Sequence, residues 1–255
     1  MIKILRRLRY FIQFAYNGTN YHGWQIQPSA ISVQEVLTTA MNTLFRDNFE
    51  LVGAGRTDAG VHAKIMYAHF DTATLFDQKI MIQKLNSFLP KDITVIRFFE
   101  VDSAAHARFD AVSRSYEYHI HTFKDSFLKD LSYYHFRSLN LEKMNEAAAI
   151  LLEYEDFECF SKTHTDVFTF NCTVTEALWT RENEHLVFHI TANRFLRNMV
   201  RAIVGTLINV GLEKVPVSEV RKIIESKNRG NAGFSVPAHG LYLTNVVYPY
   251  INETK

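Results

Sequence analysis

The sequence has little cysteine, no long apolar run and almost no net charge, and each of these shortages excludes a class of protein. Its 255 residues include only Cys159 and Cys172, which are too few for a disulfide framework and lack the spacing of a zinc site. Such usage is typical of the reducing cytoplasm, where we expect the protein to reside. No run of about 20 apolar residues could form a transmembrane helix. The basic residues near the N-terminus are not followed by the apolar stretch of a signal peptide.

Nucleotide-binding motifs are also missing. The glycine-rich segment of residues 53–63 is not followed by Gly-Lys-Ser/Thr, and it lacks the third glycine of a dinucleotide fingerprint. The net charge of +1 argues against phosphate contacts over the whole surface, so RNA binding would need basic residues gathered on one face. Such clusters are present, namely Arg6, Arg7 and Arg9, then Arg194, Arg197 and Arg201, and finally Lys227 and Arg229.

The residues that are abundant point to a buried core. Hydrophobic residues make up 47% of the chain, and the 20 Phe and 12 Tyr belong mostly to core and strands, with a few available to stack on bases. Two histidine pairs, His62 with His69 and His119 with His121, have no Cys, Asp or Glu at metal-ligand spacing. We therefore expect no metal, and no other cofactor.

The hydrophobic pattern predicts two similar halves. In the first half, strand, helix, strand, strand, helix and strand follow one another over 10–16, 33–44, 50–52, 65–71, 78–89 and 93–101. Ser32 with Glu35 forms a capping box before the first helix, Asp77 caps the second, and Pro90 stops it. This order is that of a ferredoxin-like unit.

The second half repeats the order. It predicts a strand at 115–122, a helix at 141–152 capped by Asn140, a hairpin of 171–180 with 185–193, helices at 195–210 and 218–226, and a strand at 241–248. The expected fold is therefore α+β, with ferredoxin-like halves at 1–104 and 105–255. Their antiparallel sheets would join, with the active-site cleft between the halves.

The segment Gly53 to Ala63 is the most informative part of the chain. Its glycines allow a sharp turn that would present Arg56 and Asp58 in a cleft. A carboxylate beside a guanidinium stays ionised and can serve as nucleophile or general base. Composition alone favours the plainer alternative, in which Asp and Thr bond to nearby backbone within an ordinary turn.

Two further residues have both a structural and a functional interpretation. Arg201 lies beside an apolar stripe on a predicted helix, so its guanidinium group must reach water or pair with another group. Tyr116 lies in a strand rich in rings, where a core or cross-strand contact is the usual role. Its neighbour Tyr118 shares the same strand face.

Seven blocks, in order along the chain, resemble the tRNA pseudouridine synthase A (TruA) family. The block at 54–62 (Ala-Gly-Arg-Thr-Asp-Ala-Gly-Val-His) carries the signature, and the others lie at 16–25, 32–34, 106–109, 114–118, 195–205 and 237–243. Two departures concern Gly53, where some members carry Cys, and Phe234-Ser235-Val236, where a smaller stretch with Thr is expected. Neither involves the candidate catalytic residues.

The resemblance implies isomerisation of uridine to pseudouridine at positions 38, 39 and 40 of the anticodon stem-loop of tRNA, by a homodimer. It implies that Asp58 is the nucleophile, and that Tyr116, Arg56 and Arg201 bind substrate, with Arg201 paired to Asp58. Asp58 could attack C1′ or C6, or abstract a ribose proton, and the sequence does not choose among these. Two alternatives are a tRNA-binding protein without catalysis and an unrelated hydrolase that uses Asp58.

Overall fold

The computed structural model describes residues 7–163 and 167–251. They form a mixed α and β fold of the α+β class with mostly antiparallel strands. The chain divides into two compact units, the first comprising residues up to Val112 and from Leu243 onward, the second Ser113–Tyr242. Among the described helices, none has the length and apolar character that crossing a membrane requires.

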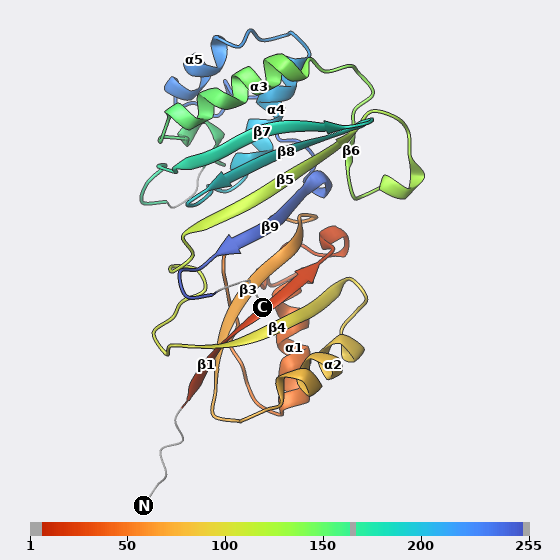
Figure 1. The fold of residues 1–255 in the computed structure, drawn as a ribbon, viewed down its shortest axis with the longest axis vertical. Coiled ribbons are helices and arrows are strands. Elements are labelled where there is room, and N and C mark those ends of the chain that lie inside the picture. The colour runs from red at the N-terminus through yellow and green to blue at the C-terminus, as the bar shows by residue number, and fades with distance from the viewer. Residues whose placement is uncertain (1–6, 164–166, 252–255) are drawn as a thin grey trace, which may run out of the picture. The chain divides into compact units, whose positions relative to one another are not determined.

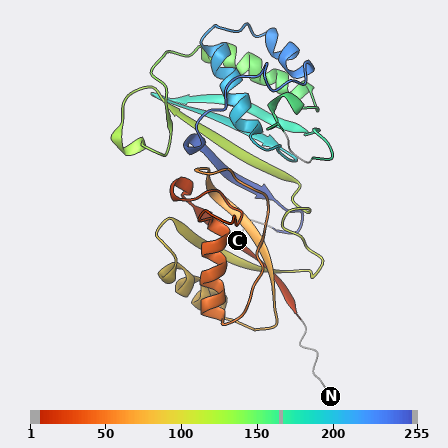
Figure 2. The same cartoon turned by 180° about the vertical axis from the view of Figure 1, so that it is seen from behind.

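The first unit is a sheet with two helices on one face (Figures 1 and 2). Its strands run in the order β4-β1-β3, and β2 and β9 also pair with β3. The bounds in chain order are β1 Leu8–Tyr16, α1 Val33–Phe45, β2 Val52–Gly53, β3 His62–Thr72, α2 Gln78–Phe88 and β4 Ile93–Val101. Strand β9 spans Leu241–Val247, and its residues from Leu243 onward belong to this unit. Each predicted strand and helix of this half is therefore confirmed, with small shifts at the ends.

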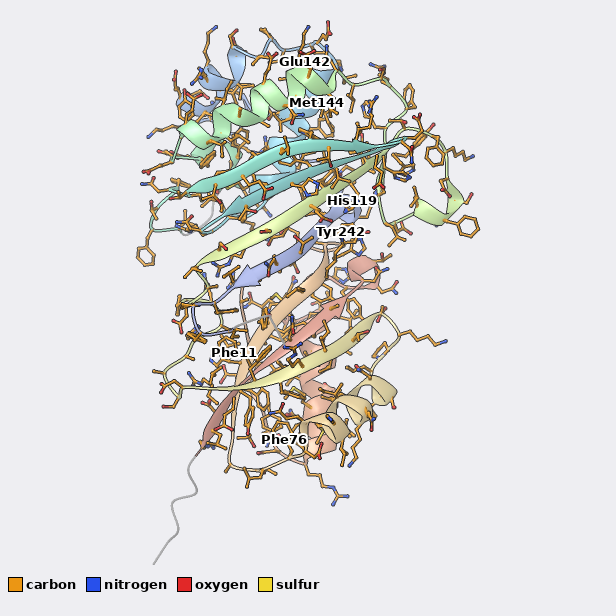
Figure 3. The ribbon with its side chains drawn as sticks, viewed as in Figure 1. Phe11, Phe76, His119, Glu142, Met144 and Tyr242 are labelled. Carbon is orange, nitrogen blue, oxygen red and sulfur yellow. The ribbon has the colours of Figure 1, made fainter. Side chains whose placement is uncertain are left out.

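The predicted helix caps of the first unit are also confirmed. Ser32 Oγ accepts from the Glu35 amide at 3.2 Å, and Asp77 Oδ1 accepts from the Ile80 amide at 3.0 Å. Each bond satisfies an amide that the first turn of a helix leaves without a partner. The core between helices and sheet is aromatic, and the Tyr10 ring of β1 meets the Phe76 ring there at 5.0 Å. Phe11, the next residue of β1, is fully buried on the other face of the sheet, where its ring meets that of Tyr248 at 5.1 Å (Figure 3).

The second unit contains the antiparallel strands β5-β8-β7, and a short β6 lies parallel to β5. Helix α4 is buried along almost its whole length and packs beside α3. On α3, Met144 is buried whereas Glu142 is exposed (Figure 3). The bounds are β5 Ser113–His121, β6 Tyr133–Tyr134, α3 Leu141–Ile150, β7 Val174–Glu182, β8 His185–Ala192, α4 Met199–Gly211 and α5 Glu219–Glu225.

Two details of the second unit differ from the sequence prediction. Helix α4 begins at Met199 rather than Phe195, because Asn198 has a left-handed backbone with φ of +68°, a conformation that Asn tolerates better than most residues. The pairing strand β6 was missed, since two residues are too few for an alternating pattern. The division into ferredoxin-like halves at 1–104 and 105–255 stays a prediction.

Candidate active site

Asp58 lies in the loop between β2 and β3, in a tight turn of the first unit. The Val61 amide donates to the Asp58 carbonyl at 3.2 Å, which closes the turn over Ala59 and Gly60. Gly60 has φ of +78°, a backbone region that glycine enters without steric cost. Asp58 is half-buried and Arg56 is exposed. The glycine-rich segment therefore forms the sharp turn that the sequence predicts.

A preceding segment of the same unit holds this turn in place. The hydroxyls of Tyr16 and Thr57 are hydrogen-bonded at 2.9 Å, and the Gly60 amide donates to the Tyr21 carbonyl at 3.2 Å. Buried His62 accepts from the Gly18 amide through Nδ1 at 3.0 Å. That bond gives His62 a structural role as an acceptor. The backbone on both sides of Asp58 is thus fixed before any substrate arrives.

Arg201 lies in the first turn of α4, in the second unit. Its Nε donates to the Val236 carbonyl at 2.7 Å, and its own carbonyl accepts from the Val236 amide at 3.2 Å. The side chain is half-buried. A backbone carbonyl therefore orients the guanidinium.

The segment of residues 233–237 runs closely along α4 and supports this arrangement. The Gly233 amide donates to Thr206 Oγ1 at 2.8 Å, and Asn198 Nδ2 donates to Ser235 Oγ at 2.8 Å. On the helix side, a Cβ at Gly205 would overlap the Phe234 carbonyl. The absence of a side chain at Gly205 is what lets the segment approach the helix.

Tyr116 and Tyr118 have different environments, although both lie on β5. Tyr116 is half-buried, and its ring meets the Phe195 ring edge-on at 5.1 Å. Tyr118 is fully buried and donates from its hydroxyl to the Pro237 carbonyl at 2.8 Å, and burial raises the pKa of Tyr118. Tyr118 therefore anchors the segment beside Arg201, whereas Tyr116 keeps an accessible part.

A polar pair occupies the neighbouring positions of the same strand. His119 Nε2 lies 3.0 Å from Glu117 Oε2, and the His119 ring meets the Tyr242 ring at 4.8 Å (Figure 3). His119 thus has both a polar contact and a ring contact within the protein. In residues 7–163 and 167–251, no three His, Cys, Asp or Glu side chains gather in a way that could hold a metal ion.

The predicted site residues divide between the two units. Asp58 and Arg56 share one turn of the first unit, whereas Tyr116 and Arg201 belong to the second. The predicted pairing of Asp58 with Arg201 therefore spans both units and stays a prediction. Sequence reasoning missed the Val236 carbonyl, because a backbone acceptor leaves no signal in the residue type. It also missed the hydroxyl of Thr57, although the motif contains that residue.

The basic clusters expected for RNA are partly used within the protein. Lys227 Nζ lies 2.6 Å from Asp156 Oδ2, and Arg229 donates to the Gly233 carbonyl at 2.9 Å. Arg9 binds Asp71 at 2.7 Å, and its predicted neighbour Arg6 lies outside the described residues. These contacts reduce the number of basic side chains that can meet phosphate.

Comparison with known proteins places the chain in a family. A family model described as "tRNA pseudouridine synthase" matches residues 12–110 and 147–249, which is more than half of the chain. The chain therefore belongs to the tRNA pseudouridine synthase family, and the resemblance drawn from the sequence is confirmed.

Individual relatives match over nearly the full length. A protein of Bacteroides thetaiotaomicron named "tRNA pseudouridine synthase A" is 53% identical over 253 residues, covering 97% of this chain and 94% of its own. Proteins with the same name from Bacteroides fragilis and Porphyromonas gingivalis are 54% and 53% identical, covering 94% of this chain and 96% and 97% of their own.

Proposed function

We propose that this protein isomerises uridine to pseudouridine in the anticodon stem-loop of tRNA, at positions 38, 39 and 40, with Asp58 as the nucleophile. One observation carries the proposal. Asp58 is held in a fixed turn of a chain that belongs to the tRNA pseudouridine synthase family. The reaction needs a positioned carboxylate, and this turn supplies one.

The reaction requires no redox partner. The bond between uracil N1 and ribose C1′ breaks, a bond between C5 and C1′ forms, and the proton originally on C5 is released to solvent while N1 gains one. Atoms and electrons balance within the nucleotide and water. A carboxylate nucleophile and a site that excludes water therefore suffice, without a cofactor or a metal.

The other site residues have supporting roles. Arg201, oriented by the Val236 carbonyl, pairs with Asp58 and aims it. Tyr116 offers its ring to the target uracil. Arg56, exposed on the same turn as Asp58, fills the place that the flipped uridine leaves or holds its phosphate. Extruding a base from a stem costs a few kcal/mol, so a residue that stabilises the open stem helps the reaction.

The proposed architecture has two ferredoxin-like halves, 1–104 and 105–255, with joined sheets and a cleft between them. The first unit supports it, because its elements follow the order β1, α1, β2, β3, α2, β4 with the antiparallel pairs β4-β1, β1-β3 and β3-β2. The second half has the element order β5, α3, β7, β8, α4, β9, interrupted by short elements. Such a protein would act in the cytoplasm as a homodimer.

Replacement of Asp58 tests the proposal. Asp58→Asn should abolish pseudouridine formation while tRNA affinity and thermal unfolding stay near wild type, because the amide has no comparable nucleophilicity. Asp47→Asn is the matched control, since Asp47 is exposed and should tolerate the change. Chemical mapping of pseudouridine and release of tritium from C5-labelled uridine in tRNA give the readouts.

The same assay separates the alternatives. Wild-type protein that binds tRNA without releasing tritium would be a binding protein without catalysis. Strand cleavage or free uracil would indicate a hydrolase. Substantial turnover by Asp58→Asn would exclude Asp58 as the essential nucleophile.

A further inference from the structure

The loop after β4 presents an aromatic ring to solvent. Phe109 is 73% exposed, and it lies between exposed Arg108 and half-buried Asp110. A single exposed ring needs no explanation in itself. The loop that carries Phe109 is unusual, however, because many hydrogen bonds hold its backbone in place.

Several bonds within the first unit fix the backbone of the loop. Arg9 donates to the Ala105 carbonyl at 3.0 Å, His69 Nδ1 accepts from the Ala107 amide at 3.1 Å, and the Tyr248 hydroxyl donates to the Ala107 carbonyl at 2.5 Å. These partners come from β1, β3 and the segment after β9. The loop is therefore anchored to the sheet itself.

A second set of bonds closes the loop immediately around Phe109. Asp110 Oδ2 accepts from the His106 amide at 2.7 Å and from the Tyr250 hydroxyl at 2.8 Å. His106 Nδ1 in turn accepts from the Arg108 and Phe109 amides at 3.1 and 3.3 Å. These bonds fix the backbone from which the phenyl group projects.

Ring contacts lead stepwise from the buried His69 to the exposed Phe109. Buried His69 meets His106 at 4.7 Å, and His106 meets Phe109 at 4.3 Å with 34° between the planes. The Arg108 guanidinium carbon lies 5.6 Å from the centre of the Phe109 ring. Burial lowers the pKa of His69 to about 4 and also lowers that of His106. Arg108 is therefore the permanent cation beside the exposed ring.

We propose that Phe109 and Arg108 form a stacking platform for an unpaired base of the RNA substrate, with the base on the phenyl ring and the adjacent phosphate on the guanidinium. This inference rests on the proposed function. Aromatic rings bind unpaired bases of any sequence by stacking, and guanidinium groups bind the phosphates. A ring that projects from a bonded backbone and packs against the His106 ring loses less conformational entropy when the base arrives than a ring on a free loop.

The experiment measures binding of an unmodified tRNA transcript to the full chain over a series of KCl concentrations. Phe109→Ala should weaken binding about 5- to 100-fold, the usual range for loss of one stacked base. Phe109→Trp should bind within about threefold of wild type, whereas Phe109→Leu, which is apolar without a π face, should resemble Phe109→Ala. The slope of log affinity against log salt should not change for these variants, since stacking releases no counterions, whereas Arg108→Gln should reduce it by about one.

The matched control is Phe127→Ala, because Phe127 is an exposed phenylalanine in the second unit at 89%. It should leave tRNA affinity unchanged. Unchanged affinity of Phe109→Ala, full affinity of Phe109→Leu or an equal loss in Phe127→Ala would each overturn the platform. A change in molecular mass in solution for Phe109→Ala would instead identify a protein-binding surface and also overturn it.

The outcome can be separated from that of the proposed function. Wild-type protein that forms pseudouridine while Phe109→Ala binds tRNA normally would refute the platform alone. Wild-type protein that binds the transcript but forms no pseudouridine would refute the catalytic proposal, whereas the effects of Phe109 substitutions on binding would still decide the platform.

Discussion

At the residue scale, the candidate site depends on backbone groups as much as on side chains. Arg201 is oriented by the Val236 carbonyl, and the turn of Asp58 is closed by the Val61 amide. Residue types left both a structural and a functional role open for Asp58 and Arg201, and the resemblance to the family indicated that they could carry the chemistry. The bonds that position them depend on where the chain returns in space, which no residue type reveals.

Arg201→Lys should lower the single-turnover rate at saturating tRNA by about 10- to 100-fold. The ammonium keeps the charge but lacks the planar fork that binds Val236 and a second acceptor together, and a small misplacement of a catalytic group costs about that much. Arg181→Lys, at an exposed position of β7, is the control. A normal single-turnover rate with weaker tRNA binding would assign Arg201 to the phosphate backbone instead.

His69 should make the stability of the first unit dependent on pH. Burial lowers its pKa in the folded protein to about 4 from the ordinary 6.5, so the unfolded chain binds the proton more readily. The stability that neutral His69 contributes to the folded protein is fully present above about pH 6.5 and is lost as the pH falls through about 4. This contribution to the free energy of unfolding is about 3 kcal/mol in order of magnitude.

Denaturant unfolding between pH 4 and 7 measures this dependence. His69→Asn, whose amide oxygen can still accept from Ala107, should flatten the curve in that interval. His22→Asn, at an exposed position, should leave the curve unchanged. An equal acid dependence in wild type and His69→Asn would show that other groups cause the acid sensitivity.

At the scale of elements, local signals and packing agree for most of the first unit. The caps at Ser32 and Asp77 and the stop at Pro90 act within one helical turn, so the sequence predicts α1 and α2 well. Helix α4 is different. Its apolar pattern begins before the helix does, because Leu196 is buried in the turn that precedes Asn198.

Gly205→Ala should destabilise the protein by about 1–3 kcal/mol, the usual cost of overpacking. Helix propensity alone favours alanine by about 0.5–1 kcal/mol. The sign of the measured change in the free energy of unfolding therefore shows whether overpacking or helix propensity dominates. The added Cβ would overlap the Phe234 carbonyl. If the main chain at Phe234 moved aside, it would displace Val236, which lies two residues further on and accepts the hydrogen bond from Arg201.

Thermal and denaturant unfolding test this substitution. Gly55→Ala serves as the control, because a Cβ there would have no atom within 4 Å. Activity should fall along with stability in Gly205→Ala if the segment of residues 233–237 orients Arg201. A variant at least as stable as wild type would show that the segment yields easily and that close packing does not fix Arg201.

At the scale of the whole molecule, catalysis should not depend on a bound cation. The isomerisation involves no net oxidation, and Asp58 can act as the nucleophile without metal activation. Chelation should therefore leave the rate of pseudouridine formation unchanged when monovalent salt keeps the tRNA folded. Loss of activity with chelator that a trace of transition metal restores would contradict this.

The sequence by itself determined the family, the candidate nucleophile and most of the elements, because these depend on short motifs, hydrophobic period and caps that act over a few residues. Only the tertiary structure decided what holds each site residue. Tyr16 and Tyr21 fix the turn of Asp58 from another strand and loop, and Val236 meets Arg201 from 35 residues away. Such contacts arise when distant backbone and side-chain groups satisfy one another in a packed interior, and their partners are therefore set by topology rather than by neighbouring residues.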